Sequence, residues 1–237
     1  MLYNKLYYNI FSKRLNMNTL YLVRHGENFA NITKQFSHRV IDLNLTEKGE
    51  MQAKQTGMHF KNVHIDELYS SPLIRAKQTA DEISKNTNLK YVIVENLREL
   101  NVGALETSPA GQSEWQLHNE ILSSWVNGDM TKSFPEGENG FSLCGRFKEA
   151  LYNIFFGKEN KAIAVVGHAG IFTYGMINLC CQEDVNIIKQ TENNNCSIST
   201  FKIEAKNNML KCKLIKWADV THLYGDAANF VSAVPRY

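Results

Sequence analysis

Short apolar runs alternate with longer amphipathic segments along most of this chain. Runs with the composition of buried strands lie at residues 20–23, 67–70, 91–94 and 162–166. Helical spacing of apolar residues, together with capping signals, predicts helices at 46–60, 72–86, 113–126, 141–156 and 169–180. Strands that alternate with helices indicate an α/β fold, a three-layer α/β/α sandwich around a mostly parallel central sheet.

Two further segments near the end of the chain, 197–203 and 211–217, alternate around Lys206-Asn207-Asn208. Alternation on both sides of a short polar turn predicts a C-terminal β-hairpin. The stretches 99–112 and 134–140 contain the Gly and Pro residues typical of irregular loops. Because no repeat and no shift in composition occurs after Met17, we expect one domain over residues 17–237.

The first sixteen residues differ in character from the rest of the chain. Leu2, Leu6 and Ile10 recur at helical spacing, but the segment lacks the compact apolar core and the small-residue cleavage site of a signal peptide. We expect residues 1–16 to be an N-terminal extension, either disordered or misassigned upstream of a functional Met17. A helix that docks on the domain or touches a membrane is the alternative.

The composition is that of a globular protein and gives no sign of a nucleic-acid-binding or membrane-spanning one. The hydrophobic content of 43% and the charged content of 21% are ordinary for a soluble globular protein. A net charge of +2 favours neither nucleic acid nor a membrane as a partner. The five cysteines form no CxxC pair, which favours reduced thiols in a cytoplasmic protein over a metal or redox site. No apolar run approaches the roughly 18 residues of a spanning helix.

Candidate catalytic residues lie at or shortly after the ends of the predicted strands. His25 and His168 each stand just beyond an apolar strand, Arg24 precedes His25, and Arg75 lies early in the helix that comes after the second strand. Each residue alone is more often structural than catalytic. If the strands are parallel neighbours, all four converge at one edge of the sheet. Two guanidinium groups beside two imidazoles suit a phosphoryl group, because arginine presents a planar fork that matches phosphate oxygens.

Five motifs surround these residues. In chain order they are Leu22-Val23-Arg24-His25-Gly26-Glu27 with Asn31; Asp42, Leu45-Thr46, Gly49 and Gln52-Ala53; Ser70-Ser71-Pro72 with Arg75-Ala76 and Gln78-Thr79-Ala80; Glu99 with Gly103 and Glu106; and Gly167-His168-Ala169-Gly170. Together they resemble the histidine phosphatase superfamily, the phosphoglycerate-mutase-like proteins. The resemblance covers most of the chain from Thr19 to about Gly170, and the pairing of the first motif with a distant second histidine is specific.

The resemblance implies a phosphohistidine mechanism. His25 is then the nucleophile and Glu99 the proton donor and base, while Arg24, Arg75 and His168 complete the catalytic set. The residues expected to bind substrate around them are Asn31, Asn28, Gly26 and Ala169. Like charges on the arginines should lower the pKa of His25 from about 6.5 and keep it neutral. No metal or cofactor is expected, because the arginines neutralise the phosphoryl charge.

Some positions depart from the family pattern or fall outside it. Asn28 stands where the family often carries a small hydroxyl residue, and Thr107 stands where glycine is expected. Glu106 is expected to be structural rather than catalytic. The histidines that match no motif are expected at the surface or in the core, and these are His38, His59, His64, His118 and His222.

The remaining choice concerns the reaction. Mutases that resemble this signature carry an arginine and a tyrosine close after the catalytic glutamate and a tandem arginine pair further on. Here Leu100 and Val102 occupy the first two positions, no Arg-Arg pair occurs, and residues 134–138 resemble a segment of the phosphatase branch. We therefore expect hydrolysis of a small phosphorylated metabolite, with a mutase or a non-catalytic binder of phosphorylated ligands as the alternatives. The expected partner is a small-molecule phosphate ester, and a homodimer stays open.

Overall fold

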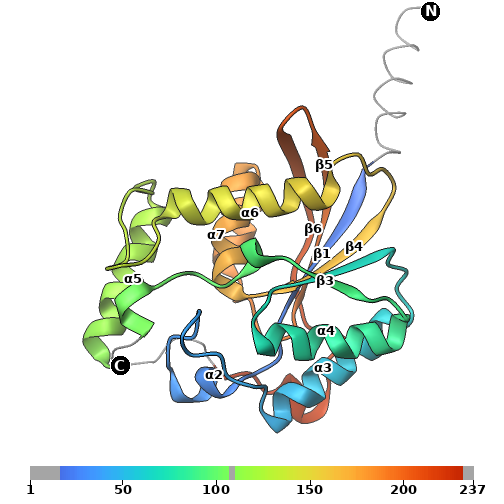
Figure 1. Cartoon of the computed structure of the whole chain (residues 1–237), viewed down its shortest axis with the longest axis horizontal. Helices are drawn as coiled ribbons and strands as arrows, with labels where there is room; N and C mark the ends of the chain where they lie inside the picture. The colour runs from blue at the N-terminus through green and yellow to red at the C-terminus, as the bar shows by residue number, and fades with distance from the viewer. Residues whose placement is uncertain (1–16, 107–109, 232–237) are drawn as a thin grey trace, which may run out of the picture.

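A central β-sheet organises the computed structural model, which describes residues 17–106 and 110–231 (Figure 1). Within these residues the sheet has six strands in the order β3-β2-β4-β1-β5-β6. The strands are β1 (Asn18–Arg24), β2 (Glu67–Ser70), β3 (Tyr91–Ile93), β4 (Ala162–Gly167), β5 (Ile198–Lys206) and β6 (Met209–Asp219). The predicted extension at 1–16 and the departure at Thr107 lie outside the described residues.

The sheet combines a parallel part with an antiparallel edge. β3, β2, β4 and β1 are parallel neighbours, whereas β5 runs antiparallel to β1 and β6 runs antiparallel to β5. The predicted hairpin is formed by β5 and β6. Its turn residues Asn207 and Asn208 have φ angles of 51° and 58°, the left-handed values that a two-residue type I′ turn requires. The predicted mostly parallel sheet with a C-terminal hairpin is confirmed.

Helices cover both faces of the sheet, so the predicted three-layer sandwich is also confirmed (Figure 1). One face is covered by α3 (Glu47–Phe60) and α4 (Ile74–Thr87), and the other by α6 (Gly140–Phe155), α7 (Ala169–Leu179) and α8 (Gln182–Gln190). Alternate residues of β4 face opposite sides of the sheet. Ile163 and Val165 pack with α6, α7 and α8, whereas Ala164 and Val166 pack with α3 and α4. A strand buried on both faces reads as a continuous apolar run.

A further apolar cluster lies beyond the sheet around α5 (Gln112–Val126), which projects to the left in Figure 1. It joins α5 to three separate loops and to the start of α6. Its buried members are Phe36, Leu100, Val102, Leu105, Trp115, Ile121, Leu122, Trp125, Phe134, Leu143 and Cys144. This cluster forms one side of the candidate site.

Local capping explains where α3 begins. Thr46 is its N-cap, as predicted, and the Thr46 hydroxyl accepts a hydrogen bond from the N–H of Gly49 at 3.0 Å. Gly49 is needed because a Cβ there would lie 1.9 Å from the carbonyl oxygen of Glu27. Gly49 therefore packs closely on the backbone of Glu27, just after β1, and this packing offsets the cost of a glycine inside a helix.

The start of α4 corrects one prediction. Pro72 was expected near the first helical position, but α4 begins at Ile74 with Leu73 as its N-cap. The cap is supplied from a distant loop, since both carboxylate oxygens of Asp42 lie 3.0 Å from the N–H of Ile74. This long-range contact lets the helix start two residues beyond the proline.

Two short helices were not predicted. α2 (Phe29–Thr33) has only five residues, too few to show a period, although Asn28 and Asn31 form a capping box that marks its start. α8 carries acidic residues in its first turn and buried Val185 and Ile188 three positions apart, a signal that sequence reasoning could have used. The predicted loop at 99–112 also contains a 3₁₀ turn, η2 (Gly103–Glu106).

Candidate active site

The carboxyl ends of β1 and β4 bring the two predicted histidines together. These strands are parallel neighbours with Arg24 opposite Gly167, so the next residue on each is a histidine. The ring centroids of His25 and His168 lie 5.1 Å apart, and both side chains are buried. The strand ends therefore place both imidazoles at one edge of the sheet.

Hydrogen bonds define the protonation of His25. Its Nδ1 lies 2.7 Å from the carbonyl oxygen of Gly26, which can only accept, so Nδ1 carries the proton. The Nε–H of Arg75 donates to His25 Nε2 at 3.1 Å, and a guanidinium can only donate. Nε2 consequently carries a lone pair, as a nucleophile must.

Burial is the main cause of the lowered pKa values of His25 and His168. It lowers the pKa of His25 well below its usual range, and Arg75 and Arg24 lower it further. Burial likewise lowers the pKa of His168, with Arg75 and His25 next in importance. The sequence prediction named the arginines as the cause of a neutral His25. They contribute, but loss of water is the larger effect.

Both predicted arginines stay charged although they are buried. Burial lowers the pKa of Arg24 and of Arg75 to about 10, which leaves each guanidinium protonated at neutral pH. Arg24 donates to the carbonyl of Asn193 at 2.5 Å, and its Nε is buried without a partner in the described part of the chain. Arg75 donates to the hydroxyl and carbonyl oxygens of Ser37 at 3.1 and 2.7 Å, with Asp42 3.7 Å away.

Three backbone N–H groups fix the carboxylate of Glu99. They belong to Leu100 at 2.9 Å, Gly170 at 3.0 Å and Ile171 at 2.9 Å. The last two lie in the first turn of α7, where N–H groups and the helix dipole favour an anion. Because α7 begins directly after His168, Glu99 is tied to the same strand end as the second histidine.

Two other carboxylates of the motifs, Glu106 and Glu27, are bound away from the pocket. Glu106 accepts four backbone N–H bonds, at 2.6 to 3.0 Å, from the loop formed by residues 38–41. Glu27 accepts a hydrogen bond from the Thr46 hydroxyl and pairs with Lys48 at 2.6 Å. Among the described residues that line the pocket, Glu99 is the one carboxylate.

Two hydroxyl residues of the third motif, Ser71 and Thr79, form hydrogen bonds with His168 and with the backbone next to His25. Nε2 of His168 lies 2.7 Å from the Ser71 hydroxyl, while its Nδ1 is buried without a hydrogen-bond partner among the described residues. The N–H of Gly26 donates to the Thr79 hydroxyl at 3.1 Å. A Cβ on Gly26 would lie 2.5 Å from the carbonyl oxygen of Gly49, so only glycine fits this crossing.

The predicted asparagines form a small network beside His25. Asn28 and Asn31 exchange two hydrogen bonds, at 3.1 and 3.2 Å, across the start of α2. Asn195 donates to the side-chain oxygen of Asn31 at 3.2 Å and to the carbonyl of His25 at 3.1 Å. Nδ2 of Asn28 is buried without a partner within the described chain, so one donor is available to a ligand.

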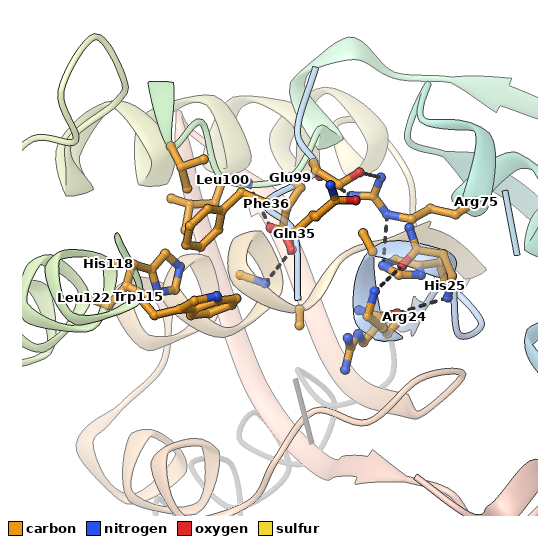
Figure 2. Close-up of a pocket in the computed structure, with 17 residues that line it drawn as sticks. Arg24, His25, Gln35, Phe36, Arg75, Glu99, Leu100, Trp115, His118 and Leu122 are labelled. Carbon is orange, nitrogen blue, oxygen red and sulfur yellow. Dashed lines mark hydrogen bonds between the residues drawn. The ribbon is translucent and has the colours of Figure 1, made fainter. Parts of the chain in front are cut away.

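A pocket of about 180 Å³ opens over these residues (Figure 2). The predicted residues that line it are Arg24, His25, Asn28, Asn31, Arg75, Glu99 and Ala169. Gly26 and His168 do not line the pocket and lie behind it. Figure 2 shows Arg24, His25 and Arg75 at one end and a group of apolar and aromatic side chains at the other, with Glu99 between them.

Several lining residues were missed by sequence reasoning. They are Ala30, Gln35, Phe36, Ser37, Trp115, His118, Leu122 and Gly170, whereas the loop that carries Leu100 and Val102 was expected to cover the pocket. His118 was expected to have no part in the site. Its spacing from Trp115 and Leu122 puts all three on one face of α5, a signal that was available. Phe36 and Ser37 carry no such signal, because their place depends on how a loop folds back.

The comparison with known families agrees with this geometry. A sequence profile of the histidine phosphatase superfamily (branch 1) matches residues 20–216. The chain belongs to this superfamily. The match spans both histidines, both arginines and Glu99, so the recognition made from the motifs is confirmed.

Curated histidine phosphatase relatives cover nearly the whole chain. One is the probable phosphoglycerate mutase GpmB of Erwinia tasmaniensis, 29% identical over 216 residues, which are 89% of this chain and 97% of the relative. The protein of the same name from Escherichia fergusonii is 29% identical over 211 residues, again 89% and 97% of the two chains.

Solved structures show the same fold. Phosphoserine phosphatase from Entamoeba histolytica, in complex with 3-phosphoglyceric acid, has a TM-score of 0.69 at 23% identity, over 88% of this chain and 100% of that one. YhfR of Bacillus stearothermophilus has a TM-score of 0.70 at 23% identity, over 86% and 98%. At these identities the likeness concerns the fold alone.

Two further features concern the described residues of this superfamily member. Over 17–106 and 110–231, no helix is long and apolar enough to cross a membrane. In the same ranges, no group of three or more His, Cys, Asp or Glu side chains is arranged to hold a metal ion.

Proposed function

We propose that this protein is a phosphomonoester hydrolase that works through a phosphohistidine formed on His25. The observation that carries the proposal is the environment of His25 Nε2. This atom has a lone pair, belongs to an imidazole that burial keeps neutral, and lies beside the charged guanidinium of Arg75. Arg24 supplies a second buried positive charge with an Nε that has no partner in the described chain.

In the proposed first step, Nε2 attacks phosphorus and forms an N–P bond while the P–O bond to the leaving group breaks. Protonated Glu99 gives its proton to the departing oxygen, which leaves as an alcohol. Arg75 then donates to phosphoryl oxygens instead of Nε2, and Arg24 and Asn28 use their free N–H groups on the same oxygens. Such donors stabilise charge in a loose transition state and do so without a metal.

The second step returns the enzyme to its starting state. Glu99 takes a proton from water, the water oxygen attacks phosphorus, and the N–P bond breaks to release inorganic phosphate. Glu99 suits both proton transfers by position, because it lies between the cationic end of the pocket and its apolar end (Figure 2). The substrate is a small phosphorylated metabolite, since a pocket of about 180 Å³ is small for a ligand site.

Hydrolysis is favoured over phosphoglycerate isomerisation by the residues that come after Glu99. Leu100 and Val102, which stand where the resembling mutases carry arginine and tyrosine, are buried in the apolar cluster and line the pocket. Apart from Arg24 and Arg75, no lysine or arginine of the described ranges lines it. A mutase must hold the carboxylate of its substrate, and the described lining offers no further cation for it.

A mutase remains the second candidate because relatives 29% identical carry that name. A third candidate is a binder of phosphorylated ligands that has lost turnover. We further propose a cytoplasmic location, with which the five free cysteines of the described chain are compatible.

The deciding experiment compares two reactions of the same purified protein. Release of inorganic phosphate is measured from p-nitrophenyl phosphate and ethyl phosphate, and isomerisation of 3-phosphoglycerate is measured in parallel with a bisphosphoglycerate primer. We expect hydrolysis, abolished in His25→Ala, and no primer-dependent isomerisation. Faster isomerisation than hydrolysis would make the protein a mutase. Binding of vanadate without turnover in either assay would make it a binder.

A further inference from the structure

The end of the pocket away from the arginines is built almost entirely from apolar and aromatic side chains. We name this part the distal wall, and its residues are Phe36, Leu100, Val102, Trp115, His118 and Leu122. They come from the loop after α2, the segment after Glu99 and one face of α5. In a substrate whose phosphorus faces Nε2 of His25, the leaving group would extend past Glu99 onto this wall (Figure 2).

Three rings of the distal wall form a joined aromatic surface. The centroids of Phe36 and Trp115 lie 4.5 Å apart with planes inclined by 36°. His118 lies 5.1 Å from Phe36 at 32° and 5.1 Å from Trp115 at 68°. Such a surface offers ring faces and edges to a flat group, and aromatic pairs add stabilisation beyond the area they bury.

The indole N–H of Trp115 and Nδ1 of His118 each have a hydrogen-bond partner in the described part of the chain. The indole N–H of Trp115 donates to the carbonyl oxygen of Lys34 at 3.0 Å. Nδ1 of His118 lies 3.1 Å from the side-chain oxygen of Asn119, and burial lowers the pKa of His118, so its ring is neutral at pH 7. A charged leaving group would lose water at this wall and gain no opposite charge from it, which costs binding free energy.

We infer that the natural substrate is a monoester of an uncharged alcohol or phenol that carries a flat, apolar ring. The inference rests on the proposed hydrolase function and adds the chemical class of the leaving group. The ring lies against Phe36, Trp115 and His118, while the phosphoryl group lies between Arg24 and Arg75. Esters with a carboxylate near the phosphoryl group are disfavoured by the same wall.

A matched series of esters tests the preference for an uncharged leaving group with a flat, apolar ring. Ethyl phosphate, benzyl phosphate and 2-phosphoglycolate share the unit R–CH₂–O–phosphate and differ only in R, which is methyl, phenyl or carboxylate. We expect kcat/KM for benzyl phosphate to exceed that for ethyl phosphate by on the order of tenfold to a hundredfold, the range for a group buried in an apolar pocket. We expect phosphoglycolate to fall below ethyl phosphate by about tenfold or more.

Two tryptophans on α5 provide a variant and its control. Trp115 and Trp125 are both buried in the same cluster and both donate an indole N–H to a carbonyl oxygen, but only Trp115 lines the pocket. Trp115→Leu should lower the ratio of kcat/KM for benzyl over ethyl phosphate by about fivefold to tenfold. Trp125→Leu should leave the ratio unchanged. Phe36→Leu gives the same readout if Trp115→Leu does not fold, as judged by circular dichroism.

The outcomes separate this inference from the function on which it rests. Hydrolysis without a preference for benzyl phosphate, or with phosphoglycolate as the best ester, overturns the inference and leaves the hydrolase standing. An unchanged ratio in folded Trp115→Leu and Phe36→Leu also overturns it. Phosphate release from none of the three esters, nor from p-nitrophenyl phosphate, contradicts the hydrolase itself.

Discussion

Arg146 and Glu138 form a two-point ion pair, in which Nε donates to Oε2 at 2.9 Å and Nη2 donates to Oε1 at 2.7 Å. The remaining N–H groups of Arg146 bind the backbone that carries Glu99. They donate to the carbonyl oxygens of Asn96 at 3.0 Å, Arg98 at 2.7 Å and Glu99 at 3.0 Å. Glu138 in turn accepts the N–H of Asn101 at 2.7 Å, so the pair fixes this segment on both sides of Glu99.

Replacing Arg146 with lysine should misplace Glu99, because an ammonium group cannot reproduce the planar fork of five N–H donors. We expect kcat for ethyl phosphate to fall by about tenfold to a hundredfold, since a displacement near 1 Å costs rates of that order. The fall for p-nitrophenyl phosphate, whose leaving group needs little protonation, should be smaller. Arg98→Lys is the control, because Arg98 pairs with Glu95 at the surface. Equal slowing of both esters would show that Arg146 supports the fold only.

Glu99→Gln tests whether Glu99 donates a proton to the leaving group or only binds the substrate. Hydrolysis of ethyl phosphate should slow by ~10²–10⁴-fold, as is typical when a general acid is lost. With p-nitrophenyl phosphate, phosphorylation of His25 should stay fast while its hydrolysis lacks a base. Stopped-flow absorbance should then show a burst close to one nitrophenolate per active site. His25→Ala should abolish that burst, and equal slowing of both esters without a burst would assign Glu99 to binding or shape.

Removal of divalent metal should leave the hydrolysis rate unchanged. Arg24 and Arg75 stay charged in the buried site and supply the positive charge that a phosphoryl group needs. The measurement is phosphate release before and after dialysis against excess EDTA. Activity that disappears with the chelator and returns with a divalent ion would refute the proposed mechanism.

Stability should decrease as pH falls from about 6.5. His25, His38 and His168 are buried, and burial lowers the pKa of all three in the folded state. Below about 6.5 the unfolded chain binds protons that the folded chain does not, so the free energy of unfolding falls with pH. The loss is at most ~1.4 kcal/mol per pH unit for each histidine.

Urea unfolding at pH 7.5, 6.5, 5.5 and 5.0 measures this dependence. His38→Gln should make the slope smaller, because one buried group no longer titrates. His64→Gln serves as the surface comparison, since the His64 side chain is 82% exposed. A free energy of unfolding that stays constant or rises towards pH 5 would contradict the prediction.

Deleting residues 1–16 should leave turnover and melting temperature nearly unchanged. In the described part of the chain, the sheet begins at Asn18, and the apolar clusters and the pocket contain residues from Leu20 onward. Calorimetry of the shortened chain tests this. A loss of several degrees would show that the extension packs on the domain.

The sequence alone determined the sheet and the pair of histidines. Val165 and its neighbours form a continuous apolar run because β4 is buried on both faces, and that composition is visible without a structure. Thr46 marks a helix start because capping is local. The sequence predicted that His25 and His168 meet at one edge if their strands are parallel neighbours, and the structure shows that β1 and β4 are such neighbours.

Tertiary structure alone decided what surrounds that pair. Asp42 caps α4 from a loop 32 residues away, and the N–H groups of α7 hold Glu99 from 71 and 72 residues away. Phe36 meets Trp115 only because α5 packs beyond the edge of the sheet. Asp42, Glu99 and Gly170 stand in the sequence motifs, but a motif does not say which distant segments it contacts, since that depends on how whole elements pack. For that reason the sequence predicted the cationic end of the pocket, while the aromatic distal wall became visible only in the folded protein.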